Sequence, residues 1–407
     1  MRRFAWLAAA SLCFATPANA QIKVAFIEGL SGPFANIGEN GLAHFRVIAD
    51  RINASGGVLG QKIEIVKFDN KGSPQETLIV FQAVVDQGIR YITQGNGSGV
   101  AAAIIDAVNK HNARNPGKEV LYLNYSAVDP DLTNSKCSFW HFRFDSNNDQ
   151  KMAALTNFIT KQPKIKSVYI IGQDYAHGHQ FARAAEAMLK EKRPDIKIVG
   201  NDLHQIGKVK DFSPYVSKIA ASGADVILTG NWGNDLTLLV KAAVDAGLKT
   251  PFYTYYAGSL GVVPTLGAGG VDRLVQVTEW HANISPNQGE EIANEFKRRY
   301  HQYDYYYARA ETEMMMLVKA MKETNSTEPR KVALALEGMH YTGDGGEAWI
   351  RKQDHQIMQP QYISTLAKID GKVVKYGAEN TQFGYRTDVV IPARDGELPT
   401  TCNFQRP

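Results

Sequence analysis

The sequence predicts an α/β protein of two lobes, each built on a doubly wound parallel sheet. Short apolar strands alternate with helical segments from residue 21 to about 275, which is typical of parallel strands joined by right-handed crossovers. The alternation begins again after residue 149, as expected for two similar units in series. The length of 407 residues also exceeds what one compact core usually holds.

The first lobe is expected to hold four strands with helices between them. Its predicted strands are 22–27, 62–69, 89–93 and 120–124, and its predicted helices are 75–87 and a segment that ends near 51. Glycine and proline interrupt the chain at 28–33 and 53–57. Phe139 to Phe144 is interpreted as an extended connector to the second lobe.

The second lobe repeats the pattern with five strands. The predicted elements are helices 149–161, 179–192, 213–221 and 235–246, and strands 167–172, 196–201, 225–229, 252–255 and 274–278. Helices at 288–303, 307–323 and 329–337 come next, followed by strands at 347–352, 360–368 and 371–376 and an irregular tail to Pro407.

The stretch from Ile89 to Ala103 carries the clearest indication of a binding site. A buried strand breaks at glycines 95, 97 and 99 and restarts as an alanine-rich helix. The free N–H groups of the first helical turn and the Ser98 hydroxyl suit an anion. The alternative is that Ser98 is only a helix N-cap. In an open parallel sheet ligands bind beyond the carboxyl ends of the strands, where loops 28–38, 94–99 and 125–130 also lie.

The first twenty residues have the three parts of a secretory signal. Arg2 and Arg3 precede an apolar run to Ala15, and Ala18-Asn-Ala20 provides small residues for cleavage after Ala20. An uncleaved membrane anchor would need about 18 apolar residues, more than this run provides. The mature protein is therefore expected to be exported, with a formal charge of +2 in place of +4. This balance gives no basis for a nucleic-acid partner.

Cysteine usage also fits export. Cys13 leaves with the signal segment, so Cys137 and Cys402 remain as a pair in a compartment where disulfides persist. A bridge between them is the favoured interpretation, and two buried free thiols are the alternative.

No catalytic or cofactor motif is found. Ser98 is not flanked by the two glycines of a nucleophile elbow, because Asn96 and Val100 occupy those places, and Val100 also stands where a dinucleotide motif needs its third glycine. His177 and His179 are two residues apart, without a cysteine or acidic cluster that would make a metal site. Asp304-Tyr-Tyr-Tyr307 is interpreted as the packed start of a helix. We expect no enzyme activity, no cofactor and no metal.

Three segments carry a resemblance to a known family. They are Leu30-Ser-Gly-Pro-Phe-Ala-Asn-Ile-Gly38, Ile52-Asn-Ala-Ser-Gly-Gly-Val-Leu-Gly60 and Ala243-Val-Asp-Ala-Gly-Leu-Lys-Thr-Pro251. Together they resemble periplasmic solute-binding proteins of hydrophobic amino-acid ABC transporters, of the leucine/isoleucine/valine-binding type.

The resemblance implies a type I fold whose lobes are joined by three crossing strands, near 142–146, 276–280 and 346–351. It implies that 21–143 plus 280–346 form lobe 1, and that 144–279 plus 347–407 form lobe 2 with the C-terminal tail. It also implies a monomer that delivers a small carboxylate ligand to a membrane permease.

The resemblance also implies a set of ligand-binding residues. Ser98 aligns with a serine that holds the ligand carboxylate, and Ser126 and Val128, with Ala127 between them, align with further carboxylate contacts. Tyr175 and Trp232 align with aromatic walls of the second lobe, and Ile37 aligns with an aromatic position of the first. Tyr256, in the segment Tyr255-Tyr-Ala-Gly258, is a further predicted ligand-binding residue.

That last segment departs from the family, because it lacks the acid that pairs with a ligand ammonium. Glu28 and Glu279 are the nearest other acids by loop position. The predicted ligand is a small hydrophobic amino acid of the branched-chain type. The alternatives are an aromatic carboxylate such as a benzoate or cinnamate derivative, and an exported ligand-sensing receptor.

Overall fold

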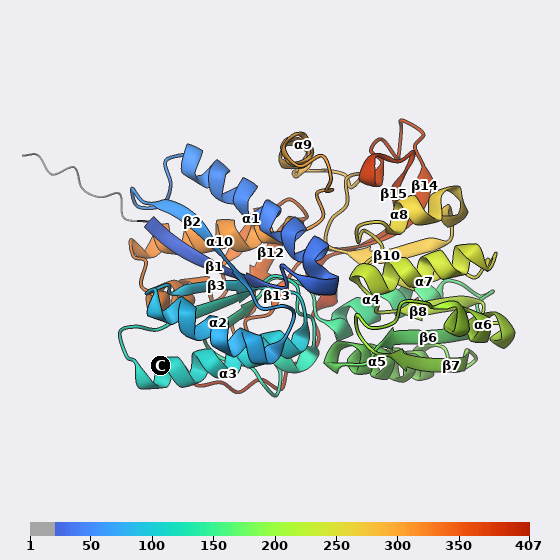
Figure 1. Cartoon of the computed structure of the whole chain (residues 1–407), viewed down its shortest axis with the longest axis horizontal. Coiled ribbons are helices and arrows are strands. Elements are labelled where there is room, and N and C mark those ends of the chain that lie inside the picture. Colours follow the sequence, from blue (N-terminus) through green and yellow to red (C-terminus); the bar gives the residue numbers. More distant parts are fainter. Residues whose placement is uncertain (1–20) are drawn as a thin grey trace, which may run out of the picture.

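The computed structural model describes residues 21–407, and the predicted signal segment at 1–20 lies outside the described residues. It confirms the predicted α/β fold class with two lobes side by side (Figure 1). The chain passes from one lobe to the other between β5 and α4, between β10 and α9, and again ahead of β14.

Lobe 1 is built on a five-stranded parallel sheet in the order β2-β1-β3-β4-β5. Its strands are β1 (Gln21–Glu28), β2 (Lys62–Asp69), β3 (Tyr91–Gln94), β4 (Leu121–Asn124) and β5 (His141–Arg143). Every residue of β3, β4 and β5 is buried, as expected for parallel strands that helices cover on both faces.

Two groups of helices cover the lobe 1 sheet. They are α1 (Ala35–Ala54), α2 (Pro74–Asp86) and α3 (Ser98–Arg114), and the later α9 (Glu290–Arg299), α10 (Ala308–Thr324) and α11 (Pro329–Leu336). Helix α10 packs on α1, and Arg51 of α1 forms an ion pair with Glu295 of α9 at 2.8 Å. The chain after β10 therefore returns to lobe 1, where α10 lies beside α1 in Figure 1.

Lobe 2 is built on a seven-stranded sheet in the order β15-β14-β10-β9-β8-β6-β7. Its strands are β6 (Ser167–Gln173), β7 (Lys197–His204), β8 (Val226–Thr229), β9 (Phe252–Thr254), β10 (Leu274–Thr278), β14 (Gln361–Lys368) and β15 (Phe383–Ile391). Its helices are α4 (Asn148–Thr160), α5 (Ala176–Lys192), α6 (Ser213–Ser222), α7 (Gly233–Asp245) and α8 (Val262–Leu266). Strands β6 to β10 are parallel, whereas β14 and β15 add an antiparallel edge.

A small antiparallel sheet precedes the last crossing. It consists of β11 (His340–Gly343), β12 (Gly346–Ile350) and β13 (Ile357–Met358). Short 3-10 turns complete the described chain, at Gly32–Phe34, Pro130–Thr133, Gly267–Gly270, Ala378–Asn380 and Ala393–Gly396.

Several predicted elements were wrong. The connector at 139–144 contains β5, which pairs with β4 in the sheet. The predicted strand at 371–376 is absent, because Asp370 Oδ1 accepts backbone hydrogen bonds from Lys372, Val373 and Val374 and closes a turn there. The tail predicted to be irregular contains β15, which pairs with β14 along its whole length.

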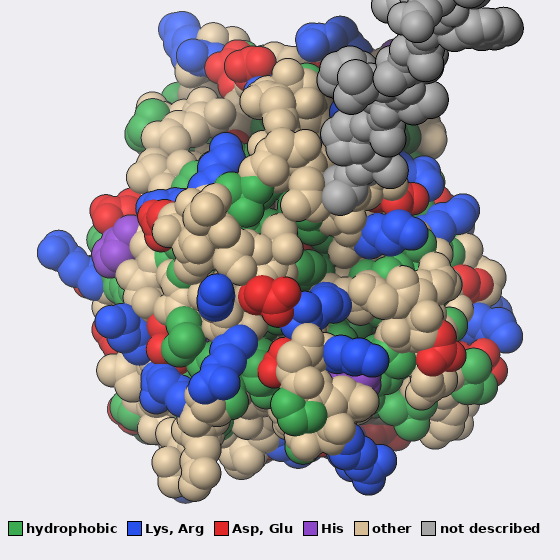
Figure 2. All heavy atoms as spheres, turned by 90° about the vertical axis from the view of Figure 1, so that its left-hand side faces the viewer, with side chains coloured by type: hydrophobic (Ala, Val, Ile, Leu, Met, Phe, Trp, Pro, Cys, Tyr) green, Lys and Arg blue, Asp and Glu red, His purple; other side chains and the backbone are tan. Residues whose placement is uncertain are grey.

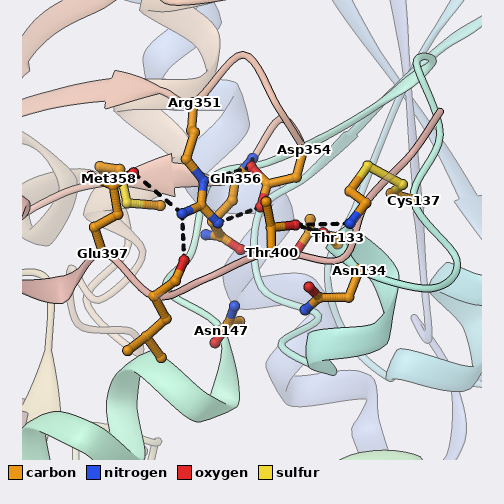
Figure 3. A network of polar contacts seen from close by, with 12 residues as sticks. Thr133, Asn134, Cys137, Asn147, Arg351, Asp354, Gln356, Met358, Glu397 and Thr400 are labelled. Atoms are coloured by element: carbon orange, nitrogen blue, oxygen red, sulfur yellow. Dashed lines mark hydrogen bonds and ion pairs between the residues drawn. A yellow bond between two sulfur atoms is a disulfide. The ribbon is translucent and has the colours of Figure 1, made fainter. Parts of the chain in front are cut away.

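The C-terminal tail leaves lobe 2 after β15 and runs back to lobe 1. The structure confirms the disulfide between Cys137 and Cys402. Polar contacts hold the tail near the disulfide. Figure 3 shows Arg351 paired with Asp354, and Thr400, which donates to the carbonyl oxygen of Thr133. Arg351 also donates to the carbonyl oxygen of Leu398 at 2.6 Å. The tail therefore makes a further connection between the lobes.

On the end of the molecule formed by lobe 1, basic and acidic side chains are interspersed over the surface (Figure 2). This distribution fits the nearly balanced charge of the chain. Within residues 21–407, no helix is long and apolar enough to cross a bilayer.

Candidate functional site

A cleft between the lobes brings all eight predicted ligand residues together. These are Ile37, Ser98, Ser126, Ala127, Val128, Tyr175, Trp232 and Tyr256. The lobe 1 residues come mainly from loops that follow β3 and β4, and the lobe 2 residues from loops that follow β6, β8 and β9, so both sets lie at carboxyl ends of strands. The cleft has a volume of about 30 Å³.

Ser98 lies at the turn from β3 into α3. Gly97 is the N-cap, with φ of 94°, and Ser98 is the first residue of the helix. The interpretation of Ser98 as an N-cap was therefore wrong. Its Oγ accepts a hydrogen bond from the Asp129 amide at 3.3 Å, which links this turn to the loop after β4. The first-turn amides and the Ser98 hydroxyl form an end that favours an anion.

The two lobe 1 loops approach so closely that only glycine fits between them. A Cβ on Gly95 would lie 2.7 Å from the Cβ of Ser126 and 2.8 Å from its amide nitrogen. On the other side, Asn124 Oδ1 accepts from the amides of Ser126 and Ala127 at 3.1 and 2.7 Å. Those two amides thus already donate hydrogen bonds within the protein, and the Ser126 hydroxyl is the polar group of this loop that remains for other partners.

Glu28 at the end of β1 holds the loop after β3 in place. Its Oε1 accepts hydrogen bonds from the amides of Gly95 and Asn96, at 2.7 and 2.9 Å, and from the Tyr125 hydroxyl at 2.6 Å. Burial raises the pKa of Glu28 to about 7, although these hydrogen bonds oppose the shift. Glu28 therefore supports the cleft from behind and does not line it.

Lobe 2 contributes an aromatic wall. Trp232 Nε1 donates to the Tyr175 hydroxyl at 2.8 Å, which fixes both rings. The Trp232 ring also stacks on Phe34 of lobe 1, with centroids 4.7 Å apart, and Asn234 donates to the carbonyl oxygen of Pro33 at 3.1 Å. The first loop of lobe 1 thus contacts lobe 2 directly across the mouth of the cleft.

Five further side chains that were not predicted from sequence also line the cleft: Asn96, Ser259, Tyr306, Tyr307 and Arg309. Tyr306 and Tyr307 belong to Asp304-Tyr-Tyr-Tyr307, which is interpreted from sequence as the packed start of a helix, and Arg309 lies in the first turn of α10. Three successive tyrosines followed by an arginine were the available signal. Arg309 is 1% exposed and is the charged residue of the lining.

Arg309 belongs to a buried network of four charges at the crossings. It pairs with Glu279 after β10, its Nε lies 3.6 Å from Asp145 in the first crossing, and Nη2 donates to Ser126 Oγ at 3.1 Å. Lys151 of α4 pairs with the other oxygen of Asp145 at 2.8 Å. Burial alone would lower the pKa of Arg309, but the carboxylates of Glu279 and Asp145 raise it well above its usual value. The guanidinium is therefore charged.

Two neighbouring side chains lie outside the cleft. The Tyr255 hydroxyl donates to the Asn148 carbonyl oxygen inside lobe 2. His177, interpreted as a loop residue, is buried in the first turn of α5 with Nε2 3.0 Å from the Gly230 carbonyl oxygen. Among the described residues, no cluster of His, Cys, Asp or Glu could hold a metal ion. The arrangement therefore suits noncovalent binding of a small anion between aromatic rings.

Comparison with known proteins gives concordant results. A family model described as periplasmic binding protein matches residues 21–372. Over 409 aligned residues the chain is 33% identical to the Leu/Ile/Val-binding protein homolog 4 of Brucella abortus (strain 2308), covering 98% of this chain and 97% of that protein.

Two solved structures are similar over nearly the whole chain. The leucine-, isoleucine-, valine-, threonine- and alanine-binding protein from Brucella ovis, in a closed conformation, has a TM-score of 0.84 and 31% identity, covering 95% of this chain and 100% of that one. A solute binding protein of an ABC transporter from Rhodopseudomonas palustris BisB5, in complex with 3,4-dihydroxybenzoic acid, has a TM-score of 0.79 and 18% identity, covering 92% and 98%.

Proposed function

Because the chain belongs to the periplasmic binding protein family, we propose that it is the extracytoplasmic solute-binding subunit of an ABC uptake transporter. The supporting observation is an interlobe cleft that combines the N-terminus of α3, Ser98 and the buried cation Arg309. Such a site captures a small carboxylate and closes over it. The proposal includes secretion by the segment at 1–20, a monomeric state, the division between lobes given by the sequence, and a membrane permease as the partner.

The geometry favours a carboxylate without an ammonium group, such as a benzoate or cinnamate derivative. Within the described chain, the lining of the cleft includes Arg309 but no Asp or Glu side chain. Glu279 and Asp145, the acids nearest to Arg309, are already paired with it. An ammonium enclosed there would lack a partner, which is costly in a water-poor cleft.

The aromatic lining supports the same ligand class. Tyr175, Trp232, Tyr256 and Tyr306 surround the cleft with ring faces and hydroxyl groups. Lys151 lies behind this wall, 5.7 Å from the centroid of the Tyr256 ring, and its charge is paired with Asp145. Flat rings with polar edges offer both stacking and hydrogen bonds to an aromatic acid.

A branched-chain amino acid is the second candidate, because the relatives at 33% and 31% identity carry names that state such ligands. In that case the ammonium would have to take Glu279 or Glu28 from its present partners. Both carboxylates are buried and hydrogen-bonded within the protein. The two candidate functions thus differ in whether one of these carboxylates has to leave its present protein partners when the ligand binds.

Matched ligand pairs distinguish the two classes. Phenylpropanoate and phenylalanine, or methylpentanoate and leucine, differ only in the ammonium group. Calorimetric titration of the refolded, ligand-free protein is expected to give at least about tenfold tighter binding of the acid in each pair, with 4-hydroxybenzoate and 4-coumarate also binding. Tighter binding of phenylalanine and leucine, abolished by Glu279→Gln or Glu28→Gln, would establish the amino-acid function instead.

A transport role is separated from a sensory role in cells. Deletion of the gene should abolish uptake of the radiolabelled ligand, and expression of the full chain should restore it. Uptake that persists in the deletion strain, with a lost transcriptional response to the ligand, would identify a receptor.

A further inference from the structure

A second cavity lies beside the crossing that follows β10. It is lined from lobe 2 by β10, β15 and the segment 376–378, and from lobe 1 by α9 and the tyrosines ahead of α10. We call this cavity the hinge chamber. Its lining includes the charged residues Glu290, Lys297 and Asp304, the polar residue Gln276, and the aromatic residues Tyr306 and Tyr385. Tyr306 also lines the carboxylate cleft, so its ring separates the two sites.

Two buried polar atoms of this lining have no partner among the described residues. Gln276 is 2% exposed, and its Nε2 donates to Ser364 Oγ at 3.3 Å, which leaves Oε1 without a hydrogen bond. That oxygen lies 3.9 Å from where a Cβ of Gly258 would stand. The hydroxyl of Tyr385, which is 5% exposed, is also unpartnered. Buried polar atoms are nearly always paired, so these two indicate a polar ligand that donates a hydrogen bond to Gln276 Oε1.

The charged residues that line the chamber, Glu290, Lys297 and Asp304, leave one net negative charge, which favours a cation. Lys297 is neutralised by Asp304 at 2.9 Å, whereas Glu290 interacts with the Tyr376 hydroxyl and has no cation partner in the lining. Aromatic ring faces attract cations in the same way.

The dimensions indicate how such a ligand would lie. The hinge chamber has a volume of about 60 Å³, twice that of the carboxylate cleft. It adjoins a wider groove of about 450 Å³, with which it shares Asn283, Asn287, Glu290 and Tyr376. The ammonium end of such a ligand would lie in the chamber, and a larger tail would extend into the groove.

We propose that the hinge chamber is a second binding site, which takes a small primary amine with its ammonium at Gln276 Oε1 and the Tyr385 hydroxyl. Both lobes build it, since Lys297 donates to the carbonyl oxygen of Gly377 at 3.4 Å and Asp304 accepts from the amide of Glu379 at 2.8 Å. An amine bound there stabilises this arrangement of the lobes and is thereby coupled to the cleft.

Benzylamine is the probe, and benzyl alcohol and benzoate are its uncharged and anionic counterparts. Calorimetry on the full mature chain is expected to show saturable benzylamine binding below about 10 mM, at least about tenfold tighter than benzyl alcohol. Gln276→Leu and Tyr385→Phe should each weaken it about fivefold or more. Glu290→Gln, at the rim, should weaken it too without disturbing the buried sheet.

Ser98→Ala is the matched control, because it alters the carboxylate cleft and leaves the chamber intact. Benzylamine affinity unchanged in Ser98→Ala supports a separate site, and this result does not depend on which ligand the cleft binds. Absence of saturable binding, equal or tighter binding of benzyl alcohol or benzoate, or loss of benzylamine binding in Ser98→Ala would each overturn the proposal. Circular dichroism of every variant confirms that a loss of binding is not a loss of fold.

Discussion

Arg309 at the start of α10 and Glu279 just after β10 form an ion pair in which both side chains are buried, at 1% and 5% exposed. The pair joins a helix of lobe 1 to the second crossing. Through Asp145 the guanidinium also reaches the first crossing, and through Ser126 it reaches the carboxylate cleft. Burial alone would raise the pKa of Glu279, but Arg309 and Lys151 lower it, so Glu279 remains ionised.

The first prediction is that Arg309→Gln destabilises the protein by about 3–5 kcal/mol, because it leaves the buried Glu279 carboxylate without its ion-pair partner and leaves Asp145 paired with Lys151 alone. Denaturant unfolding measures the change. Arg299→Gln is the matched control, because the Arg299 side chain is 36% exposed and its ion pairs lie at the surface. Its loss should cost at most about 1 kcal/mol.

A double variant tests the cause of that effect. Arg309→Gln with Glu279→Gln removes both members of the pair, and should be more stable than the sum of the single changes predicts. Additive losses would mean that the pair contributes little, and that packing of the Arg309 side chain determines the stability.

The second prediction concerns the carboxylate contact. Ser98→Ala should weaken binding of the tightest ligand of the panel by about 1.5–3 kcal/mol, because a charged group loses a hydrogen bond in a closed cleft. Ser55→Ala is the control, since the Ser55 hydroxyl donates to the Arg51 carbonyl oxygen at the far end of α1. Equal affinities of the two variants in calorimetry would remove Ser98 from the ligand site.

The third prediction is a pH dependence set by Glu28. Its pKa is raised from 4.5 to about 7, so the stability contributed by the neutral form is complete below pH 4.5 and is lost as the pH rises through 7. The shift corresponds to about 3 kcal/mol. Oε2 has no partner among the described residues and is the position for the proton. Glu28→Gln mimics this neutral form and should flatten the fall in unfolding free energy between pH 5 and 8.

Ligand binding should follow the same titration. A carboxylate bound near Gly95 and Asn96 is repelled by ionised Glu28, so affinity should decrease about threefold to tenfold from pH 6 to 8 in the wild type and stay constant in Glu28→Gln. Glu313→Gln is the control, because burial raises the pKa of Glu313 to about 8 outside the lining of the cleft. An unchanged pH profile in Glu28→Gln would assign the dependence to another group.

The parts of this fold that local patterns determine were predictable. Strands 62–69 and 274–278 have the predicted bounds, since apolar residues and flanking breakers define them. Strand β15 was missed because its residues alternate only weakly and its position depends on pairing with β14, which no local pattern reveals. At 371–376 the apolar Val373 and Val374 favoured a strand, but the Asp370 carboxylate closes a turn.

The residues of the cleft also divide into those that local patterns predict and those that depend on long-range packing. Loops after parallel strands converge on one edge, so residues such as Ser98, Ser126 and Trp232 could be assigned to a common cleft from sequence. Their contact with a ligand stays a prediction. Tyr306, Tyr307 and Arg309 reach the cleft only because α10 returns to lobe 1 and packs on α1, a long-range contact that helical periodicity does not encode.

The last prediction concerns the tail. Cys137 and Cys402 lie 265 residues apart in sequence, and β15, which precedes the tail, belongs to lobe 2 whereas Cys137 belongs to the chain of lobe 1. Removing the disulfide with the double change Cys137→Ser and Cys402→Ser should lower the unfolding free energy by about 2–4 kcal/mol. The folded tail should stay docked, because Thr401 donates to Asn134 Oδ1 at 2.9 Å and Arg406 pairs with Glu337 at 2.8 Å.

Two measurements check this prediction separately. Mass spectrometry of the exported protein should find both cysteines protected from alkylation until a reductant is added, and limited proteolysis should leave the tail of the folded double variant intact. If alkylation without reductant labels both thiols, the bridge does not form in the exported protein. If instead protease removes the tail of the folded variant, then the disulfide, and not the contacts of Thr401 and Arg406, holds the tail against lobe 1, and its loss should also make the lobes separate more readily.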